Sequence, residues 1–550
     1  MRKMKYKGYI ACLAFLSFLT GCDKDFLERP PKDRIVDANY YQTAEQVLSS
    51  TSPLYNVVWF AYNDQASHGI GDARAGLLYS PSYQSENIRM NTTGVTGENG
   101  NSWRAFYNVV GQANTAIVNI NKFAPESVPA DVKNHAIGEA RFMRGVAYSY
   151  LVQNWGAVPI IANNETVLTD TTIARNTEES VWEFILRDIR YASKVLPETP
   201  VQTGRLTKWA AEGMLAKMFL TRAGVGAGGS RRQSDLDSAA YYAKRVIDNS
   251  GKTLMPDYAE LFRTANNNNQ ESLFALQWKY DGDWGTQNSV QAFLAFGSSI
   301  TGFGDGWGGD IGGSLHALQL YEDLEQDERR KATYMLPGDN YDYIHEIVDE
   351  KIVPLHVRTD NNGQEDYKSR ANVKKYVVGL PSDNAGKVTQ QHTEINTYML
   401  RLADIYLIYA EAILGNNAST SDATALEYFN AVRTRAGLEP KSSITWADIH
   451  NERMVEFAME GQGWYEFTRL HYYNPQLAYQ MLSSQDRGLF WIYPNDKDNA
   501  TSWELVPQST PLTRTVNVNE SNFYLPLPAT ELSRAPNLKK EPVPYNFDEE

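Results

Sequence analysis

The sequence has 550 residues, of which 42% are hydrophobic and 21% are charged, proportions that exclude a disordered or collagen-like chain. Lysine and arginine number 52 against 66 aspartate and glutamate residues, and the formal net charge is −14. Nucleic-acid binding depends on clustered positive charge, so this acidic balance argues against a nucleic-acid partner.

The N-terminus resembles a bacterial lipoprotein signal. A basic segment that contains Arg2, Lys3, Lys5 and Lys7 precedes an apolar stretch, residues 9–20, that is too short to span a bilayer. The stretch ends at Leu19-Thr20-Gly21-Cys22, which resembles a lipobox. We therefore predict a signal peptide over residues 1–21, lipid attachment at Cys22 and a tether over residues 22–40. The alternative is an ordinary secretion signal with an incidental cysteine.

Cysteine usage agrees with export. Only Cys12 and Cys22 occur, and Cys12 lies in the segment that we expect to be removed. The mature chain would then have no intramolecular disulfide, no thiol nucleophile and no cysteine-based metal site. Acidic residues 23, 25 and 28 are similar to the export signal of Bacteroidetes surface lipoproteins, which implies the outer face of the outer membrane. No later stretch reaches ~18 apolar residues, so lipid is the predicted anchor.

Helical periodicity dominates residues 41–250. Apolar residues at spacings of three and four predict helices over residues 102–120, 132–155, 178–196, 207–223 and 236–249. Thr177, which precedes two glutamates, is expected to cap the third of these helices. Trp103 joins the apolar stripe of the first helix and is therefore placed in the core.

A second helical region is expected over residues 396–470, with helices at 398–414, 423–436 and 446–470. The pattern Ala239-x-x-Tyr242-x-x-x-Val246 recurs as Ala425-x-x-Tyr428-x-x-x-Val432 on the second helix of two antiparallel pairs. This faint repeat predicts a mostly α fold built from tetratricopeptide-like helix pairs. A generic helical bundle is the alternative.

Residues 251–395 and 471–550 have a different composition. Gly, Asn and Asp interrupt the first segment, which has candidate strands at 272–278 and 374–378, and the second is Pro-rich with one candidate strand at 523–525. We expect a single domain over residues 41–550, in which the helices support a large loop-rich face with short strands. Loops of this length usually carry function.

Several sequence blocks resemble the SusD/RagB family of nutrient-binding lipoproteins. These blocks are residues 139–150, 154–160, 401–412, 430–437, 452–461, 525–532 and 537–538. With the lipobox they span nearly the whole chain. Arg534-Ala535 and Tyr465-Glu466 depart from the usual family residues at positions that have no binding role.

The resemblance implies a surface lipoprotein with no catalytic activity. Family members capture oligosaccharides, or peptides in the RagB branch, and sit as a lid on a SusC-like TonB-dependent transporter in the outer membrane. We therefore expect an oligosaccharide as the ligand and such a transporter as the partner. A peptide-binding member of the same fold and, from another class, a glycoside hydrolase remain as alternatives.

Ligand contacts are expected in the loops, because the family's signature helices are scaffold. A sugar ring packs its C–H face on Trp or Tyr, and its hydroxyls need carboxylate, amide or guanidinium partners. Loop 278–313 holds both kinds. The residues predicted to bind ligand there are Tyr280, Asp283, Trp284, Asp305 and Trp307. The alternative is that the tryptophans are buried anchors of a long loop.

A second candidate loop covers residues 71–91. Asp72 and Arg74 lie close to Tyr83, and such a group can bind sugar hydroxyls. The alternative is an ion pair between Asp72 and Arg74 within the protein.

Other sequence motifs give weaker evidence of function. Residues 304–309 fit G-x-G-x-x-G without the strand, turn and helix of a dinucleotide site. Asp281-Gly-Asp283 matches only the start of a calcium loop, so no cofactor is predicted and a structural Ca²⁺ is left open. No H-E-x-x-H motif offers zinc ligands. Glu452, Glu456 and Glu460 share a helical face and are expected to be solvated or to brace the scaffold.

Overall fold

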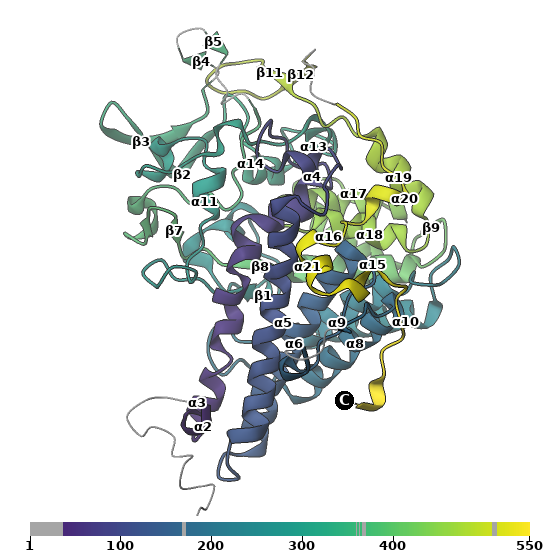
Figure 1. The fold of residues 1–550 in the computed structure, drawn as a ribbon. Helices are drawn as coiled ribbons and strands as arrows, with labels where there is room; N and C mark the ends of the chain where they lie inside the picture. The colour runs from purple at the N-terminus through teal and green to yellow at the C-terminus, as the bar shows by residue number, and fades with distance from the viewer. Residues whose placement is uncertain are drawn as a thin grey trace, which may run out of the picture.

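The computed structural model describes residues 37–167, 172–358, 360–361, 364–365, 370–508 and 514–549. Within these residues the fold is mostly α, and the strands form six two-stranded antiparallel sheets. Figure 1 shows long helices stacked through the centre and right, with the loop-rich part and its short strands beside and above them. The predicted signal peptide and Cys22 lie outside the described residues. In the described part of the chain, no helix is both long and apolar enough to cross a membrane.

The five helices predicted in the first helical region are all present. They are α5 (Gly97–Phe123), α6 (Ala130–Trp155), α8 (Glu178–Val195), α9 (Lys208–Arg222) and α10 (Gln233–Asn249). The expected cap is confirmed, because the Thr177 hydroxyl accepts a hydrogen bond from the Ser180 amide. Each long helix packs on the next one, and α10 continues the stack onto α15 (Leu402–Leu414).

Helix α6 is the centre of the hydrophobic core. It lies between α5 and α8, so its side chains are buried on almost every face from residue 135 onward. Gly145 permits the close approach of α8, because a Cβ there would lie 3.0 Å from the Cγ1 atom of Ile189. Trp103 is 5% exposed and packs against Trp155 at 5.3 Å between ring centroids, which confirms its predicted place in the core.

The second helical region differs from the prediction in two places. It contains α15, α16 (Ala423–Arg435), α17 (Trp446–Glu456), α18 (Gly463–His471) and α19 (Pro475–Ser484). Residues 398–401 belong to a strand, β8 (Thr397–Arg401), since a short apolar run is compatible with either structure. The helix expected over 446–470 is two helices, because Met459 and Gly461 adopt left-handed backbone angles with φ of 61° and 71°.

Short elements make up the rest of the fold. The other helices are α2 (Asp37–Tyr40), α3 (Ala44–Ser49), a π-helix (Tyr62–Ala73), α4 (Ser85–Ile88), α7 (Asn164–Val167), α11 (Val290–Leu294), α12 (Ser298–Thr301), α13 (Leu315–Gln319), α14 (Glu328–Thr333), α20 (Glu520–Phe523) and α21 (Ala529–Arg534). The 3₁₀ turns are Ser52–Tyr55, Val57–Trp59, Ala259–Phe262, Thr264–Asn266, Gly308–Asp310, Pro381–Asn384, Pro536–Lys539 and Phe547–Glu549.

Four of the six strand pairs are local hairpins, and the other two join strands that are separated by at least one helix. β1 (Ser272–Leu276) confirms the strand predicted there and pairs with the distant β8. The other pairs are β2 (Asn340–Val348) with β3 (Lys351–His356), β4 (Asp360–Asn361) with β5 (Gln364–Glu365), β6 (Val388–Thr389) with β7 (His392–Thr393), β9 (Ser419–Thr420) with β10 (Ile444–Thr445), and β11 (Phe490–Pro494) with β12 (Trp503–Pro507). The strands predicted at 374–378 and 523–525 are wrong. The first segment is a turn with a positive φ at Tyr376, and α20 ends in the second.

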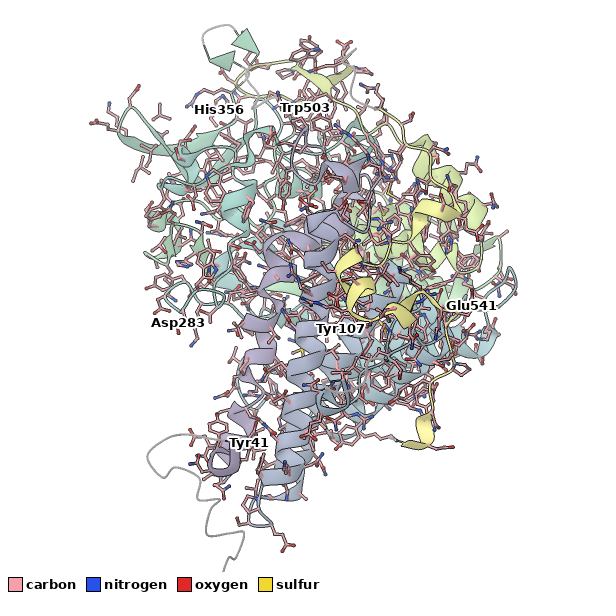
Figure 2. The ribbon with its side chains drawn as sticks, in the orientation of Figure 1. Tyr41, Tyr107, Asp283, His356, Trp503 and Glu541 are labelled. Atoms are coloured by element: carbon pink, nitrogen blue, oxygen red, sulfur yellow. The ribbon has the colours of Figure 1, made fainter. Side chains whose placement is uncertain are left out.

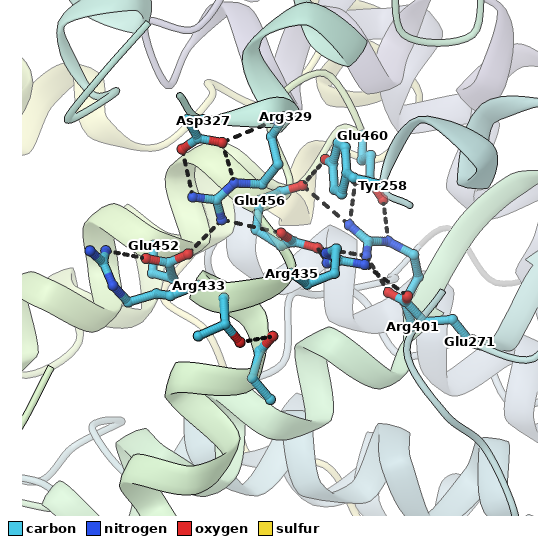
Figure 3. Close-up of polar contacts among 12 residues, drawn as sticks. Tyr258, Glu271, Asp327, Arg329, Arg401, Arg433, Arg435, Glu452, Glu456 and Glu460 are labelled. Carbon is cyan, nitrogen blue, oxygen red and sulfur yellow. Dashed lines mark hydrogen bonds and ion pairs between the residues drawn. The ribbon is translucent and has the colours of Figure 1, made fainter. Parts of the chain in front are cut away.

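A buried ion-pair cluster joins the second helical region to the loop-rich part (Figure 3). The Glu456 carboxylate on α17 bonds to Arg401 at 2.9 Å, to Arg435 at 2.5 Å and to Arg329 at 3.2 Å. Arg401 lies on β8, Arg435 on α16 and Arg329 on α14. Arg401 and Arg435 both also bind Glu271, which directly precedes β1.

The glutamate stripe therefore braces the scaffold and is not solvated. Glu452, Glu456 and Glu460 are all nearly fully buried and paired with arginines. Burial by itself would raise the pKa of Glu456, but the three guanidinium groups outweigh burial and hold that pKa well below its usual range. This carboxylate is therefore ionised at neutral pH.

We expect Glu456→Gln to lower the free energy of unfolding by about 3–5 kcal/mol, because it leaves buried guanidinium groups short of one anion. Urea denaturation measures the change. Glu427→Gln, at an exposed position on α16, is the control and should have little effect. The native carboxylate has a depressed pKa, so its contribution is present at neutral pH and is lost as pH falls. The difference in unfolding free energy between the native protein and Glu456→Gln should therefore become smaller in acid. Equal stability of both variants would contradict the bracing role.

Candidate functional site

Two tryptophans are exposed on the loop-rich part. Of the twelve in the chain, Trp284 is 61% exposed and Trp307 is 47% exposed, and both lie in the loop that the sequence singled out. The alternative of buried anchors does not hold for either residue. Each exposed indole ring offers an apolar face to solvent, so these two residues are the candidates for contact with a ligand.

The loop that carries Trp284 is a tight turn after β1. The Asp283 carbonyl accepts bonds from the Thr286 amide at 3.0 Å and the Thr286 hydroxyl at 2.7 Å, and Gly285 has a φ of 98°. The Asp283 side chain is exposed at the edge of the loop-rich part (Figure 2), and Tyr280 is half-buried. The Trp284 ring projects from this turn into solvent.

The Trp284 ring is supported by two other rings. It packs edge-to-face on Phe60 at 5.6 Å between centroids, and it lies 5.7 Å from the His392 ring on β7. Burial lowers the pKa of His392, so the imidazole is neutral at pH 7. We call Trp284, Phe60 and His392 the first aromatic group. These three rings come from separate parts of the chain, which fixes the indole orientation.

Trp307 belongs to a second aromatic group with Phe293 and Tyr83. The Trp307 ring meets Phe293 of α11 at 5.4 Å, and Tyr83 stacks on Phe293 at 6.3 Å with a 21° interplanar angle. The glycine-rich loop around Trp307 lies directly on α11, because a Cβ on Gly308 would be 2.3 Å from the Leu294 carbonyl oxygen. The backbone therefore holds the indole ring against α11 at the surface.

A polar cleft of about 400 Å³ lies next to both groups. Phe60 of the first group lines it, and so does Gln84, the neighbour of Tyr83 in the second group. Its polar lining residues are Asp64, Gln65, Gln84, Glu98, Asn101, Ser102, Arg104 and Asn108. Asp64 accepts a bond from the Ser289 hydroxyl at 2.5 Å, and burial raises the pKa of Asp64. These carboxylate, amide and guanidinium groups are the partners that sugar hydroxyls need.

Three of the predicted contact residues are buried, namely Asp72, Arg74 and Asp305. Asp305 is 4% exposed, and its carboxylate accepts a bond from the Gln391 amide at 2.7 Å. This bond ties the Trp307 loop to the turn between β6 and β7. Asp305 therefore supports the aromatic groups without reaching the surface itself.

Asp72 and Arg74 are corrected from ligand contacts to core residues. Asp72 is fully buried and accepts a bond from the Gly461 amide at 2.9 Å. The Arg74 guanidinium stacks over the Trp464 ring at 4.1 Å and donates to the Phe523 carbonyl oxygen. The ion pair considered between them is not formed either, since Asp72 pairs with His68. Their partners are distant in sequence, so local spacing gave no indication of burial.

Sequence reasoning missed Phe60, His392 and the cleft. Phe60 and His392 lie far from Trp284 along the chain, and no local pattern marks either of them. The cleft residues lie on the π-helix and at the start of α5, where they follow ordinary helical periodicity. Among the described residues, no group of three or more His, Cys, Asp or Glu side chains is placed to hold a metal ion.

Comparison with known proteins identifies the family. Residues 253–544 match the model of the SusD family, and residues 25–220 match a model described as "Starch-binding associating with outer membrane". The chain therefore belongs to the SusD family. A SusD-like protein from Bacteroides ovatus is 39% identical over 562 residues, which cover 99% of both chains.

Two solved structures are similar to this chain over most of its length. One is 37% identical with a TM-score of 0.85, and the match covers 92% of this chain and 100% of the other. The second was solved with a xylogluco-oligosaccharide and is also 37% identical, with a TM-score of 0.81 and coverage of 91% and 99%. The predicted mostly α, SusD-like fold is confirmed.

Proposed function

We propose that the protein binds an oligosaccharide across its two aromatic groups and the polar cleft beside them. The observation that carries this proposal is the exposure of Trp284 and Trp307 on rings that hold them in place. A protein does not leave two indole rings in water for stability, because burying such a ring is worth about 2–3 kcal/mol. Ligand C–H faces are the natural partners of these rings.

The geometry favours an extended glycan over a peptide. Each indole ring offers a flat surface for a sugar ring, and the cleft offers side-chain groups for the hydroxyls. A peptide ligand would instead rely on polar contacts to its backbone. A glucan with equatorial hydroxyls has flat C–H faces along its length, and the 37% identical structure with a xylogluco-oligosaccharide supports xyloglucan fragments as the first ligands to test.

The proposed activity is capture without turnover. A glycoside hydrolase needs two carboxyl groups roughly 5–10 Å apart on either side of the scissile bond. In the cleft, Asp64 is already engaged by Ser289, and Glu98 lies at the start of α5. Incubation with xyloglucan oligosaccharides, followed by chromatography, should return them unchanged. Release of shorter products would favour the hydrolase alternative.

Delivery to a membrane transporter is the second part of the proposal. The family model described as associating with the outer membrane supports a position at that membrane. We propose that a lipid on Cys22 anchors the protein on the outer surface and that a SusC-like TonB-dependent transporter receives the glycan.

We expect Trp284→Ala and Trp307→Ala each to weaken xyloglucan-oligosaccharide binding at least about tenfold. An aromatic contact contributes about 1 kcal/mol beyond its area, burial of the ring adds more, and ~1.4 kcal/mol corresponds to a factor of ten. The melting temperature should stay nearly unchanged, because both rings are exposed. Calorimetry and differential scanning fluorimetry measure the two quantities on the same samples.

The matched control is Tyr241→Ala, which removes a ring that is 57% exposed on the scaffold helix α10. This variant should keep both affinity and melting temperature. If the two tryptophan variants bind as tightly as the native protein, the proposed site is wrong.

We expect Cys22→Ala to leave an unlipidated protein that no longer fractionates with the outer membrane. The cysteine sulfur is the predicted acylation site, so its removal leaves no attachment point. Palmitate labelling and membrane fractionation test this. A variant that is still labelled and still on the cell surface would overturn the lipobox assignment.

We expect affinity purification after gentle detergent extraction to recover a SusC-like transporter together with this protein. Mass spectrometry identifies the partner, and the Cys22→Ala strain serves as the control. Recovery of the lipoprotein alone, with substrate present, would contradict the proposed partnership.

A further inference from the structure

A second cavity, of about 200 Å³, lies beside the hairpin formed by β6 and β7. Its apolar lining comes from Phe262, Tyr343, Ile344, Val377 and Val378. Three cations, Arg263, Lys374 and Lys387, also line it. The aromatic groups described above contribute no residue to this cavity, so it is separate from the proposed glycan site.

Lys374 is the unusual cation in this cavity. It is 1% exposed, its Nζ donates to the Val377 carbonyl oxygen at 3.2 Å, and the Tyr343 ring centroid lies 5.3 Å away. Within the described residues, no carboxylate lies at ion-pair distance from this Nζ. A buried ammonium group without a counter-ion is costly, because it gives up its hydration and receives only one hydrogen bond in return.

The carboxylates around the cavity are already engaged elsewhere. Asp383 accepts from the His345 ring at 2.7 Å and from the Leu380 amide at 3.0 Å. Glu394 pairs with Lys387 at 2.8 Å, and the Glu260 carboxylate pairs with Arg263 at 2.6 Å. Lys374 is therefore the group that needs an anion, and space for one is present next to it.

The charges that face Lys374 are mainly positive. Burial and, to a smaller extent, the positive charges of Arg263 and Lys375 together lower the pKa of Lys374 to about 7. Lys375 itself is paired with Glu460 at 3.1 Å. The other titratable groups of the cavity are Tyr343, Asp383, Lys387 and Glu394. An anion in the cavity would favour the protonated form of Lys374, so its binding near pH 7 would be accompanied by proton uptake.

We propose that this cavity is a binding site for a small organic carboxylate, such as a hexuronate, whose carboxyl group pairs with Lys374 and whose ring packs on the apolar wall. The apolar lining favours an organic anion over a hydrated inorganic one, since sulfate has no C–H face to bury. The site does not depend on the glycan site proposed above.

The test uses D-glucuronate as the probe, with D-glucose and sulfate as comparison ligands, at constant ionic strength. Calorimetry on the purified protein should show glucuronate binding that weakens roughly tenfold from about pH 6 to about pH 8, as the Lys374 amine loses its proton. At pH 7, titrations in buffers of different ionisation enthalpy should show net proton uptake. D-glucose should not bind, and sulfate should bind more weakly.

Variants separate this site from a purely structural lysine. Lys374→Met should abolish glucuronate binding without lowering the melting temperature, since it removes a buried charge that lacks an anion. Lys387→Met removes a cation that is already paired and should reduce the affinity much less. Trp284→Ala should leave glucuronate binding intact, so failure of the glycan site and of this site can be told apart.

Three results would overturn the proposal. The first is the absence of glucuronate binding to the native protein at about pH 6, where the amine is protonated. The second is binding that is independent of pH or equally strong for sulfate. The third is full retention of glucuronate affinity in Lys374→Met. The first two need no variant, so they hold even if Lys374→Met fails to fold.

Discussion

Everything else in the structure depends on the convergence of three arginines on the buried carboxylate of Glu456 (Figure 3). Burying so many charges is unfavourable unless every one of them is paired. Arg329 belongs to α14 within the loop-rich part, whereas Arg401 and Glu456 belong to the second helical region. The requirement for complete pairing therefore fixes where the loop-rich part attaches to the helices.

That attachment extends to the candidate site through β8 and β1. Pairing of these strands places Trp278 so that its indole N–H donates to the Thr397 hydroxyl at 3.0 Å. Asn288 then donates to the Ile395 carbonyl oxygen at 2.7 Å and accepts from Asn63 at 3.2 Å. This buried polar network ties the loop after β1 to the segment before β8 and to the π-helix.

The sequence predicted those parts of the structure that depend on interactions between residues close together in the chain. The five helices of the first region follow from apolar spacing, and the exposure of Trp307 follows from the glycines around it. Burial of Asp72 and Arg74 could not be predicted, because their partners Gly461 and Phe523 are brought to them by the fold alone. The same limit hid the cleft and the position of His392 beside Trp284.

The hairpin of β6 and β7 lies between the two proposed binding sites. His392 on this hairpin packs on Trp284, while Lys387 and Glu394 at its base line the cavity that contains Lys374. A net charge of −14 gives no long-range attraction for an anionic sugar. The proposed binding of a carboxylate would therefore depend on short-range pairing with the buried Lys374 amine, which lacks a counter-ion. A neutral sugar has no charge to pair with that amine, so the two proposed sites would differ in the ligands that they select.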